Sequence, residues 1–256
     1  MMSETRRTKR VKKKKKAFRK KVLKAIVLIG LVLGLFLYGI KFYYTQLDPM
    51  KPKLNSRVET VEKQYHIHPI AYKEIPTTYR QAVIDTEDRR FTWDPGIDPI
   101  GIIRSIGVDL VKSQYAQGGS TITQQVVDNT FLERDKSLSY KIKQTIYAIG
   151  IYDTFPKQDV FEIYANIIYF GHGAYGLVNA SETYFGKKPS ELNDGELTML
   201  AGIPNSPNRF DPLKHYADSR KRQAAVVQNM VDVGDLTSKE AQQVLNEPIR
   251  LLNASK

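Results

Sequence analysis

The first 44 residues combine a dense positive charge with an uncharged apolar run, and this pairing constrains the chain more than any other feature. Thirteen of the first 24 residues are Lys or Arg and one, Glu4, is acidic, so this segment has a net charge of +12. The whole chain also has a net charge of +12, from 39 basic and 27 acidic residues. Residues 25–256 are therefore neutral, and this part of the protein is not a polyanion binder by charge.

The apolar run at residues 25–40 has the length and the flanks of a membrane-spanning helix. As a helix it extends about 24 Å, a little less than a ~30 Å hydrocarbon core. Lys24 and Lys41 can extend to the two interfaces, and the aromatic residues 42–44 also suit an interface. Because positive flanks stay in the cytoplasm, we expect a single-pass plasma-membrane protein whose N-terminus is cytoplasmic.

The composition divides the chain into four segments. We predict a basic cytoplasmic tail at 1–24, a transmembrane anchor at 25–44, a stalk with little periodicity at 45–75, and one extracytoplasmic domain at 76–256. A cleaved signal peptide is the alternative for the first two segments, but no small-x-small site follows Ile40. The chain has no cysteine, which fits an extracytoplasmic domain that does without disulfides.

The domain at 76–256 is predicted to be mainly α, since no alternating βαβ pattern is present. A helix is expected from residue 77 into the Glu87–Asp88 pair. Residues 99–116 read as a helix too apolar for solvent, which favours either a core or a lipid-facing role. Further helices are expected at 124–132, 137–152, 157–170, 195–203 and 218–234.

Polar clusters lie at the expected helix ends. Glu87 is close in sequence to Phe91 and Trp93, an apolar wall that would raise its pKa for general acid–base use, although a solvated surface Glu fits the same residues. Ser120 follows two glycines and suits a helix N-cap. Four side chains share one polar face of the helix that follows, as in a phosphate or sugar site or in an ordinary capped helix: Thr121, Gln124, Gln125 and Asp128.

Three later clusters complete the set, and the last of them lies at residues 200–212. Tyr140 and Gln144 share a face of the next helix. Glycines interrupt the stretch 164–187, which indicates close packing or a loop lining a groove. His172 reads as structural because no partner stands at a metal-binding spacing.

Taken in order, these clusters resemble the motifs of the peptidoglycan glycosyltransferases, the family that polymerises lipid II, over about residues 76–246. The segment GGSTITQQ at 118–125 and the stretch at 166–176 are the most specific matches. The short chain and its anchor resemble the monofunctional members. The resemblance implies a lysozyme-like helical head with a smaller membrane-associated jaw, which residues 99–116 would begin.

The resemblance also assigns roles. It implies that Glu87 is the general base for the acceptor 4-hydroxyl, which attacks C1 of the donor with inversion as the lipid diphosphate leaves. It implies substrate binding by Asp88, Phe91, Arg104, Ser120, Thr121, Thr123, Gln124, Gln125, Asn129, Lys141, Gln144, Asn166 and Tyr175. The implied partners are lipid II, the growing glycan, the plasma membrane and penicillin-binding transpeptidases, with no nucleic acid. A divalent cation, Mg²⁺ or Mn²⁺, is the implied cofactor, and its ligands are unknown.

Four positions depart from the family pattern. Asp94 stands where His is usual, and three others replace groups that surround the donor diphosphate in the family: Asp128 for Lys, Tyr140 for Arg and Gln144 for Glu. The last three make the local charge more negative by 2. A bound cation at Asp128 would offset this change, as would the charges of Lys141, Lys143 and Arg104.

Three functions follow from these observations. The first is glycan polymerisation from lipid II by a peptidoglycan glycosyltransferase. The second is a catalytically weak or inactive homologue that binds lipid II or glycan and scaffolds cell-wall synthesis, which the altered diphosphate groups suggest. The third is a membrane-tethered glycan hydrolase, since muramidases place a Glu in a similar fold, but the GGSTITQQ segment argues against it.

Overall fold

The structure is a computed structural model that describes residues 2–44, 48–98, 120–132 and 137–252. The chain divides into two compact units, residues 1–48 and residues 49–256, and each is considered by itself. The described residues form helices, short 3₁₀ turns and one isolated β-bridge, and they contain no strand. The prediction of a mainly α protein is therefore confirmed.

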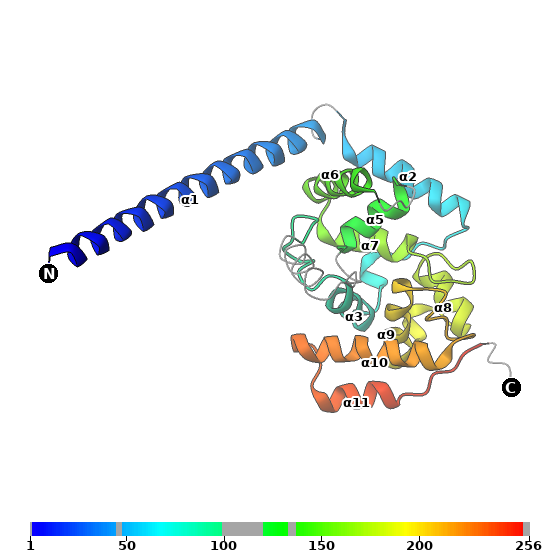
Figure 1. Ribbon diagram of the computed structural model, residues 1–256. Helices are drawn as coiled ribbons and strands as arrows, with labels where there is room; N and C mark the ends of the chain where they lie inside the picture. Colours follow the sequence, from blue (N-terminus) through cyan, green and yellow to red (C-terminus); the bar gives the residue numbers. More distant parts are fainter. Residues whose placement is uncertain (1, 45–47, 99–119, 133–136, 253–256) are drawn as a thin grey trace. The chain divides into compact units, whose positions relative to one another are not determined.

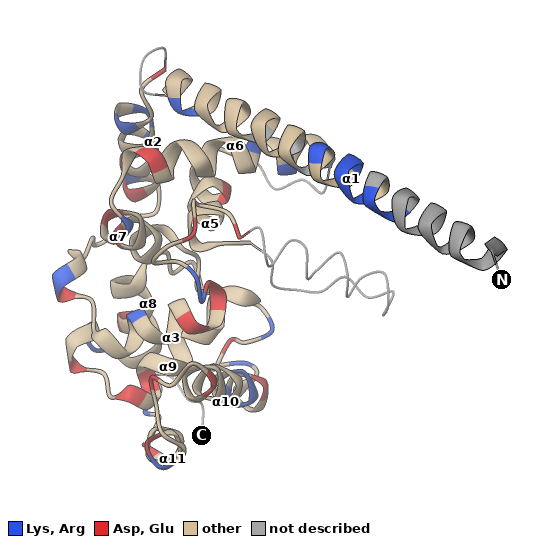
Figure 2. Cartoon of the chain, turned by 90° about the vertical axis from the view of Figure 1, so that its left-hand side faces the viewer, with Lys and Arg blue, Asp and Glu red and all other residues tan. Residues whose placement is uncertain are grey.

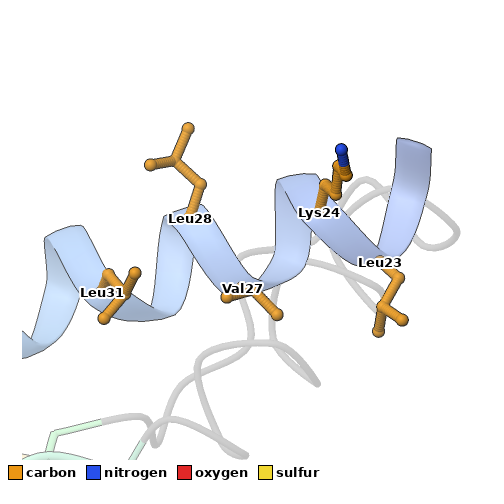
Figure 3. A pocket seen from close by; sticks show the side chains of 5 residues that line it. All are labelled: Leu23, Lys24, Val27, Leu28 and Leu31. Carbon is orange, nitrogen blue, oxygen red and sulfur yellow. The ribbon is translucent and has the colours of Figure 1, made fainter. Parts of the chain in front are cut away.

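The first unit is dominated by one long helix, α1 (Met2–Phe42). Its stretch Phe18–Phe42 is long and apolar enough to cross a membrane, with a mean hydropathy of 2.4, and it contains most of the anchor expected at 25–44. A hollow on α1 is lined by Leu23, Lys24, Val27, Leu28 and Leu31 (Figure 3). Since all five residues belong to one exposed helix, the hollow is part of its apolar surface and does not enclose a ligand.

The second unit begins with a helix where we expected a stalk. Helix α2 (Met50–Gln64) packs against three other helices of the unit, and Met50 and Leu54 are fully buried. Residues 50, 54, 58 and 61 are apolar at spacings of four and three, which is the pattern of one buried helix face. We expected no helix here because the segment contains three prolines. Two of them are compatible with the helix, since Pro49 only precedes it and Pro52 lies in its first turn.

One group of helices in this unit surrounds α3 (Thr77–Glu87). Helices α9 (Asp194–Gly202) and α10 (Tyr216–Val233) pack against α3 and against each other, and α11 (Ser238–Asn246) covers α10 and contacts α9 (Figure 1). Helix α9 is buried over almost its whole length, as expected of the central helix of a group.

A second group surrounds α5 (Ile122–Thr130). This short helix lies between α6 (Leu138–Thr154) and α7 (Lys157–Ile167), and α2 packs on all three (Figure 1). Helix α8 (Leu177–Phe185) packs against α7. The remaining turns are the 3₁₀ segments Tyr72–Glu74, Pro189–Glu191 and Ile203–Asn205.

The sequence placed most of these helices within a few residues. The helix expected at 157–170 ends at Ile167, because the chain then turns extended to form the bridge between Tyr169 and Tyr175. Helices α8 and α11 were not predicted. The helix expected at 99–116 lies outside the described residues.

Acidic and basic residues are interspersed along the described part of the second unit (Figure 2). Its core is rich in large aromatic and aliphatic side chains, with less than 2% exposure for Tyr79, Phe161, Tyr164, Phe170, Ile122, Ile151, Ile167, Leu177 and Tyr184.

Candidate active site

Glu87 is the last residue of α3, and its side chain is directed into the fold. It follows Tyr79 and Val83 at spacings of four along the helix, and both of these residues are fully buried. Positions four apart share one helix face, so the same packing that buries them carries Glu87 inward. The Glu87 side chain is only 11% exposed.

Both carboxylate oxygens of Glu87 accept hydrogen bonds from other helices. Arg222 of α10 donates from Nη2 to Oε1 at 2.9 Å, and Gln125 of α5 donates from Nε2 to Oε2 at 3.1 Å. Burial raises the pKa of Glu87, while the Arg222 charge and the two hydrogen bonds oppose that shift. Glu87 is thus a desolvated carboxylate held between the two helix groups, an environment suited to accepting a proton.

Arg222 is a site residue that the sequence did not reveal. Its Nε also lies 3.3 Å from the carbonyl oxygen of Gly202, and a Cβ at Gly202 would approach the Arg222 Cγ to 2.8 Å. The absence of a side chain at Gly202 therefore lets the arginine pass to Glu87. Arg222 lies 135 positions from Glu87 in a helix with several basic residues, so no local pattern distinguishes it.

The aromatic surroundings of Glu87 differ from those we predicted. The Trp93 side chain is 60% exposed, while Phe91 is buried against Phe161 and beneath the Lys157 ammonium. The buried phenols influenced by the Glu87 charge are those of Tyr79 and Tyr164. Burial raises the pKa of both phenols, with Glu87 as a further cause.

Asp88, next to Glu87, closes α3 and connects it to α5. Its Oδ2 accepts a hydrogen bond of 3.0 Å from the backbone N–H of Ile122, at the first turn of α5. Asp94 is almost fully buried nearby, and its Oδ1 lies 3.2 Å from the Lys157 ammonium. Burial, followed by the Asp94 charge, raises the pKa of Asp88 to about 7. Asp94 is thus paired with a lysine inside the fold.

The N-terminus of α5 is capped by Thr121 and not by Ser120, which corrects our assignment by one residue. The Thr121 Oγ1 accepts from the Gln124 N–H at 3.1 Å, and the Gln124 Oε1 accepts from the Thr121 N–H at 2.9 Å. The Thr121 hydroxyl also donates to the Gly96 carbonyl at 2.7 Å. The side chains of Thr121 and Gln124 therefore form hydrogen bonds within the protein, and Thr123 is fully buried.

The three altered positions of α5 and α6 meet in one cluster. The Asp128 Oδ1 accepts hydrogen bonds from the Tyr140 hydroxyl and from the Gln144 Nε2, the latter at 2.5 Å. The Lys141 ammonium donates to the Gln144 Oε1 at 3.0 Å and lies 3.5 Å from the Ser120 hydroxyl. We call these five residues the α5–α6 cluster. Because Gln125 and Asp128 are three residues apart on α5, the contact with Glu87 and the cluster share one helix face.

The remaining predicted residues lie around this core or elsewhere. The Asn129 Nδ2 donates to the Gln125 carbonyl at 2.7 Å. The Asn166 amide is satisfied at both ends by the backbone of Ile70, at 2.8 and 3.0 Å, so it ties α7 to the segment before α3. Tyr175 stacks on Tyr65 with ring centroids 3.7 Å apart. Arg104 lies outside the described residues.

The described residues do not form a ready metal site. They contain no group of three or more His, Cys, Asp or Glu side chains placed to hold an ion. In the α5–α6 cluster the Asp128 carboxylate already accepts two hydrogen bonds through one oxygen. These residues do not by themselves fit a resident divalent cation, and no step below depends on one.

The structure thus defines a helical protein with a site centred on a carboxylate. That carboxylate, Glu87, accepts two hydrogen bonds between two helix groups, and a polar cluster lies one turn further along α5. Residues 54–231 match the family described as transglycosylase. The chain belongs to this family.

Individual relatives agree with this assignment. The chain is similar to a protein of Cupriavidus necator named as a transglycosylase, with 39% identity over 178 residues that cover 70% of this chain and 77% of that protein. It is 34% identical to penicillin-binding protein 1A of Aquifex aeolicus over 245 residues, covering 90% of this chain and 33% of that protein. It is 38% identical to penicillin-binding protein 1A of Escherichia coli over 181 residues, covering 71% of this chain and 21% of that protein. The chain thus spans a third or less of these two penicillin-binding proteins.

Proposed function

We propose that this protein is a peptidoglycan glycosyltransferase that polymerises lipid II, with Glu87 as the general base. The observation that carries the proposal is the environment of Glu87, a buried carboxylate of raised pKa with a donor on each oxygen, in a chain of the transglycosylase family. An incoming sugar hydroxyl would replace one donor at the carboxylate. The proton would move from that hydroxyl to Glu87 as the oxygen attacks C1 of the donor with inversion, while the bond from C1 to the lipid diphosphate breaks and the diphosphate leaves with the bonding electrons.

The rest of the chain supports a location for this reaction. Helix α1 would cross the plasma membrane through its apolar stretch, with the basic tail in the cytoplasm and residues 49–256 outside. A lipid-linked donor and the growing glycan would then reach the protein at the outer face of the membrane. Penicillin-binding transpeptidases, which act on glycan strands, are the proposed protein partners.

We include a divalent cation in the proposal only as an ion that would bind together with the substrate. Since the described side chains offer no group of three ligands, Mg²⁺ or Mn²⁺ would bind chiefly through the diphosphate of the donor.

The test is polymerisation by the full chain in detergent or in vesicles. Supplied with lipid II and either Mg²⁺ or Mn²⁺, the protein should form glycan polymer, and Glu87→Gln should lower the rate by about 10²–10⁴, the range for loss of a general base. Glu182→Gln is a matched control, because Glu182 is a partly exposed carboxylate that pairs with His68 at 3.8 Å, away from the Glu87 contacts. A folded wild-type protein that forms no polymer under either cation would overturn the proposal.

A second function is favoured by the α5–α6 cluster. The opposite charges of Asp128 and Lys141 leave the cluster with no net charge, whereas the resemblance implies a net positive charge in this region of the family. A homologue that binds lipid II or glycan without turnover would show the same cluster. In that case the wild type and Glu87→Gln would both bind lipid II, and neither would form polymer.

A further inference from the structure

In the α5–α6 cluster, Asp128 determines which groups donate and which accept each hydrogen bond. One oxygen of this carboxylate accepts from both Tyr140 and Gln144. Gln144 is fully buried and Tyr140 is 7% exposed, so neither can turn to solvent for another partner. A carboxylate has no proton to donate, and it therefore fixes the direction of both hydrogen bonds.

The donor and acceptor roles of the Gln144 amide also determine its contact with Lys141. Since the Gln144 NH₂ group is committed to Asp128, its carbonyl oxygen faces the other way, where it accepts from the Lys141 ammonium at 3.0 Å. The second neighbour of that ammonium is the Ser120 hydroxyl at 3.5 Å, just before the N-cap of α5. Asp128 is thus connected to Lys141 through an intervening amide, and the Lys141 ammonium also lies 5.7 Å from the centroid of the Tyr140 ring.

The two charged groups of the cluster, the Asp128 carboxylate and the Lys141 ammonium, differ in their exposure to solvent and in their hydrogen-bond partners. The Asp128 charge is stabilised by two neutral donors. The two hydrogen-bond contacts of the Lys141 ammonium are a neutral amide and a neutral hydroxyl, and its side chain is exposed. A lysine held by neutral acceptors keeps its charge for an anion, whereas a lysine paired with a carboxylate does not.

We propose that Asp128 and Gln144 are positioning residues that hold the Lys141 ammonium as the binding group for the diphosphate of the donor. This inference rests on the proposed function, because it names the substrate group that Lys141 would meet. It also gives the altered positions one explanation. A glutamate at 144 would place a second carboxylate against Asp128 and would pair with Lys141, whereas glutamine avoids both effects.

A pair of substitutions separates positioning from simple structural support. Gln144→Glu alone brings two carboxylates into contact and should lower the melting temperature by several degrees. In Asp128→Asn/Gln144→Glu the asparagine amide can donate to Glu, and its oxygen can still accept from Tyr140, so the melting temperature should recover. The new carboxylate would then pair with Lys141, and diphosphate binding should stay weak.

The experiment measures binding of inorganic diphosphate to the full chain in detergent by calorimetry, with and without Mg²⁺, beside thermal unfolding. We expect Lys141→Met to unfold like the wild type and to weaken binding at least about tenfold, the scale of one charge-assisted hydrogen bond. Asp128→Asn/Gln144→Glu should weaken binding by a similar factor at normal stability. Lys143→Met tests the other lysine of α6 that was expected near the diphosphate, and Lys239→Met, at an exposed lysine of α11, is the control that should bind within about twofold of wild type.

Several results would overturn the inference. These are wild-type protein that does not bind diphosphate in either buffer, Lys141→Met that binds normally, or a double variant that recovers binding together with stability. A stronger effect of Lys143→Met would transfer the role to that residue and would also overturn it. If the diphosphate pattern holds but lipid II is not polymerised, the proposed polymerase function fails and the positioning role stands.

Discussion

The Glu87 carboxylate and the Arg222 guanidinium form an ion pair of 2.9 Å with side-chain exposures of 11% and 17%. The pair joins the end of α3 to α10, and Gln125 of α5 holds the other carboxylate oxygen. The Glu87 side chain is therefore fixed by three helices from distant parts of the chain. Its readiness to take a proton depends on burial, which raises its pKa, and on Arg222, which lowers it.

We expect Arg222→Met to shift the acidic limb of the pH–rate profile to higher pH. Without the arginine charge, burial acts on Glu87 with less opposition, so the carboxylate is protonated at a higher pH than in the wild type. The loss of polymerisation should therefore be larger at pH 6 than at pH 8. Arg222→Lys keeps the charge and should retain most of the wild-type profile, while an unchanged limb in Arg222→Met would contradict the role given to the pair.

The buried pair Asp94–Lys157 leads to a stability prediction. Lys157→Met should cost about 3 kcal/mol of unfolding free energy, because it leaves the nearly unexposed Asp94 carboxylate uncompensated beside Asp88. Asp94→Asn/Lys157→Met removes both charges and should recover most of that loss. Chemical denaturation of the wild type, Lys157→Met, Asp94→Asn and the double variant at pH 7.5 measures the difference, and additive losses would show that the two side chains are not coupled.

The sequence predicted most of the helices because they leave local signals, whereas the role of Glu87 as a general base was implied by the resemblance and stays a prediction. The α3 pattern with buried positions at 79 and 83 leads directly to Glu87, and the polar face of α5 contains the residue that binds it. Apolar spacing of this kind is readable from neighbours in the chain. The capping box of α11, Thr237 with Glu240, is an equally local signal that could have predicted that helix.

The unpredicted features all depend on distant contacts. Nothing near Arg222 in sequence indicates a partner 135 residues away, and nothing near Asp94 indicates Lys157, 63 residues away. The departures at 128, 140 and 144 read as three separate charge changes. Only the fold shows that they form one hydrogen-bonded unit.

Asp85 should make the stability of the protein fall as the pH rises. Burial, followed by the neighbouring Asp235 carboxyl, raises the pKa of Asp85 from 3.8 to about 7. Because the folded chain holds this proton more tightly than the unfolded chain, the contribution is full below about pH 4 and is lost as the pH rises to about 7.

Asp85→Asn removes this dependence. Between pH 4 and pH 8 the wild type should lose about 2–4 kcal/mol of unfolding free energy relative to the variant. Asp232→Asn is a suitable control, since Asp232 is a half-exposed carboxylate that faces Arg89 at 3.8 Å. Parallel pH profiles for Asp85→Asn and the wild type would disprove the assignment.

Two glycines of the loop at 171–176 should differ sharply in their tolerance of a side chain. Gly173 has φ +74° and Gly176 has φ +83°, so alanine is strained at both, at about 1–2 kcal/mol for the backbone. A Cβ at Gly173 would meet nothing within 4 Å, whereas a Cβ at Gly176 would approach the Asn166 carbonyl oxygen to 2.5 Å. Gly176→Ala must therefore displace the residue that ties α7 to Ile70, and we expect a further loss of at least about 2 kcal/mol relative to Gly173→Ala. Thermal unfolding of the two variants measures this difference, and equal losses would show that backbone strain alone determines the need for glycine here.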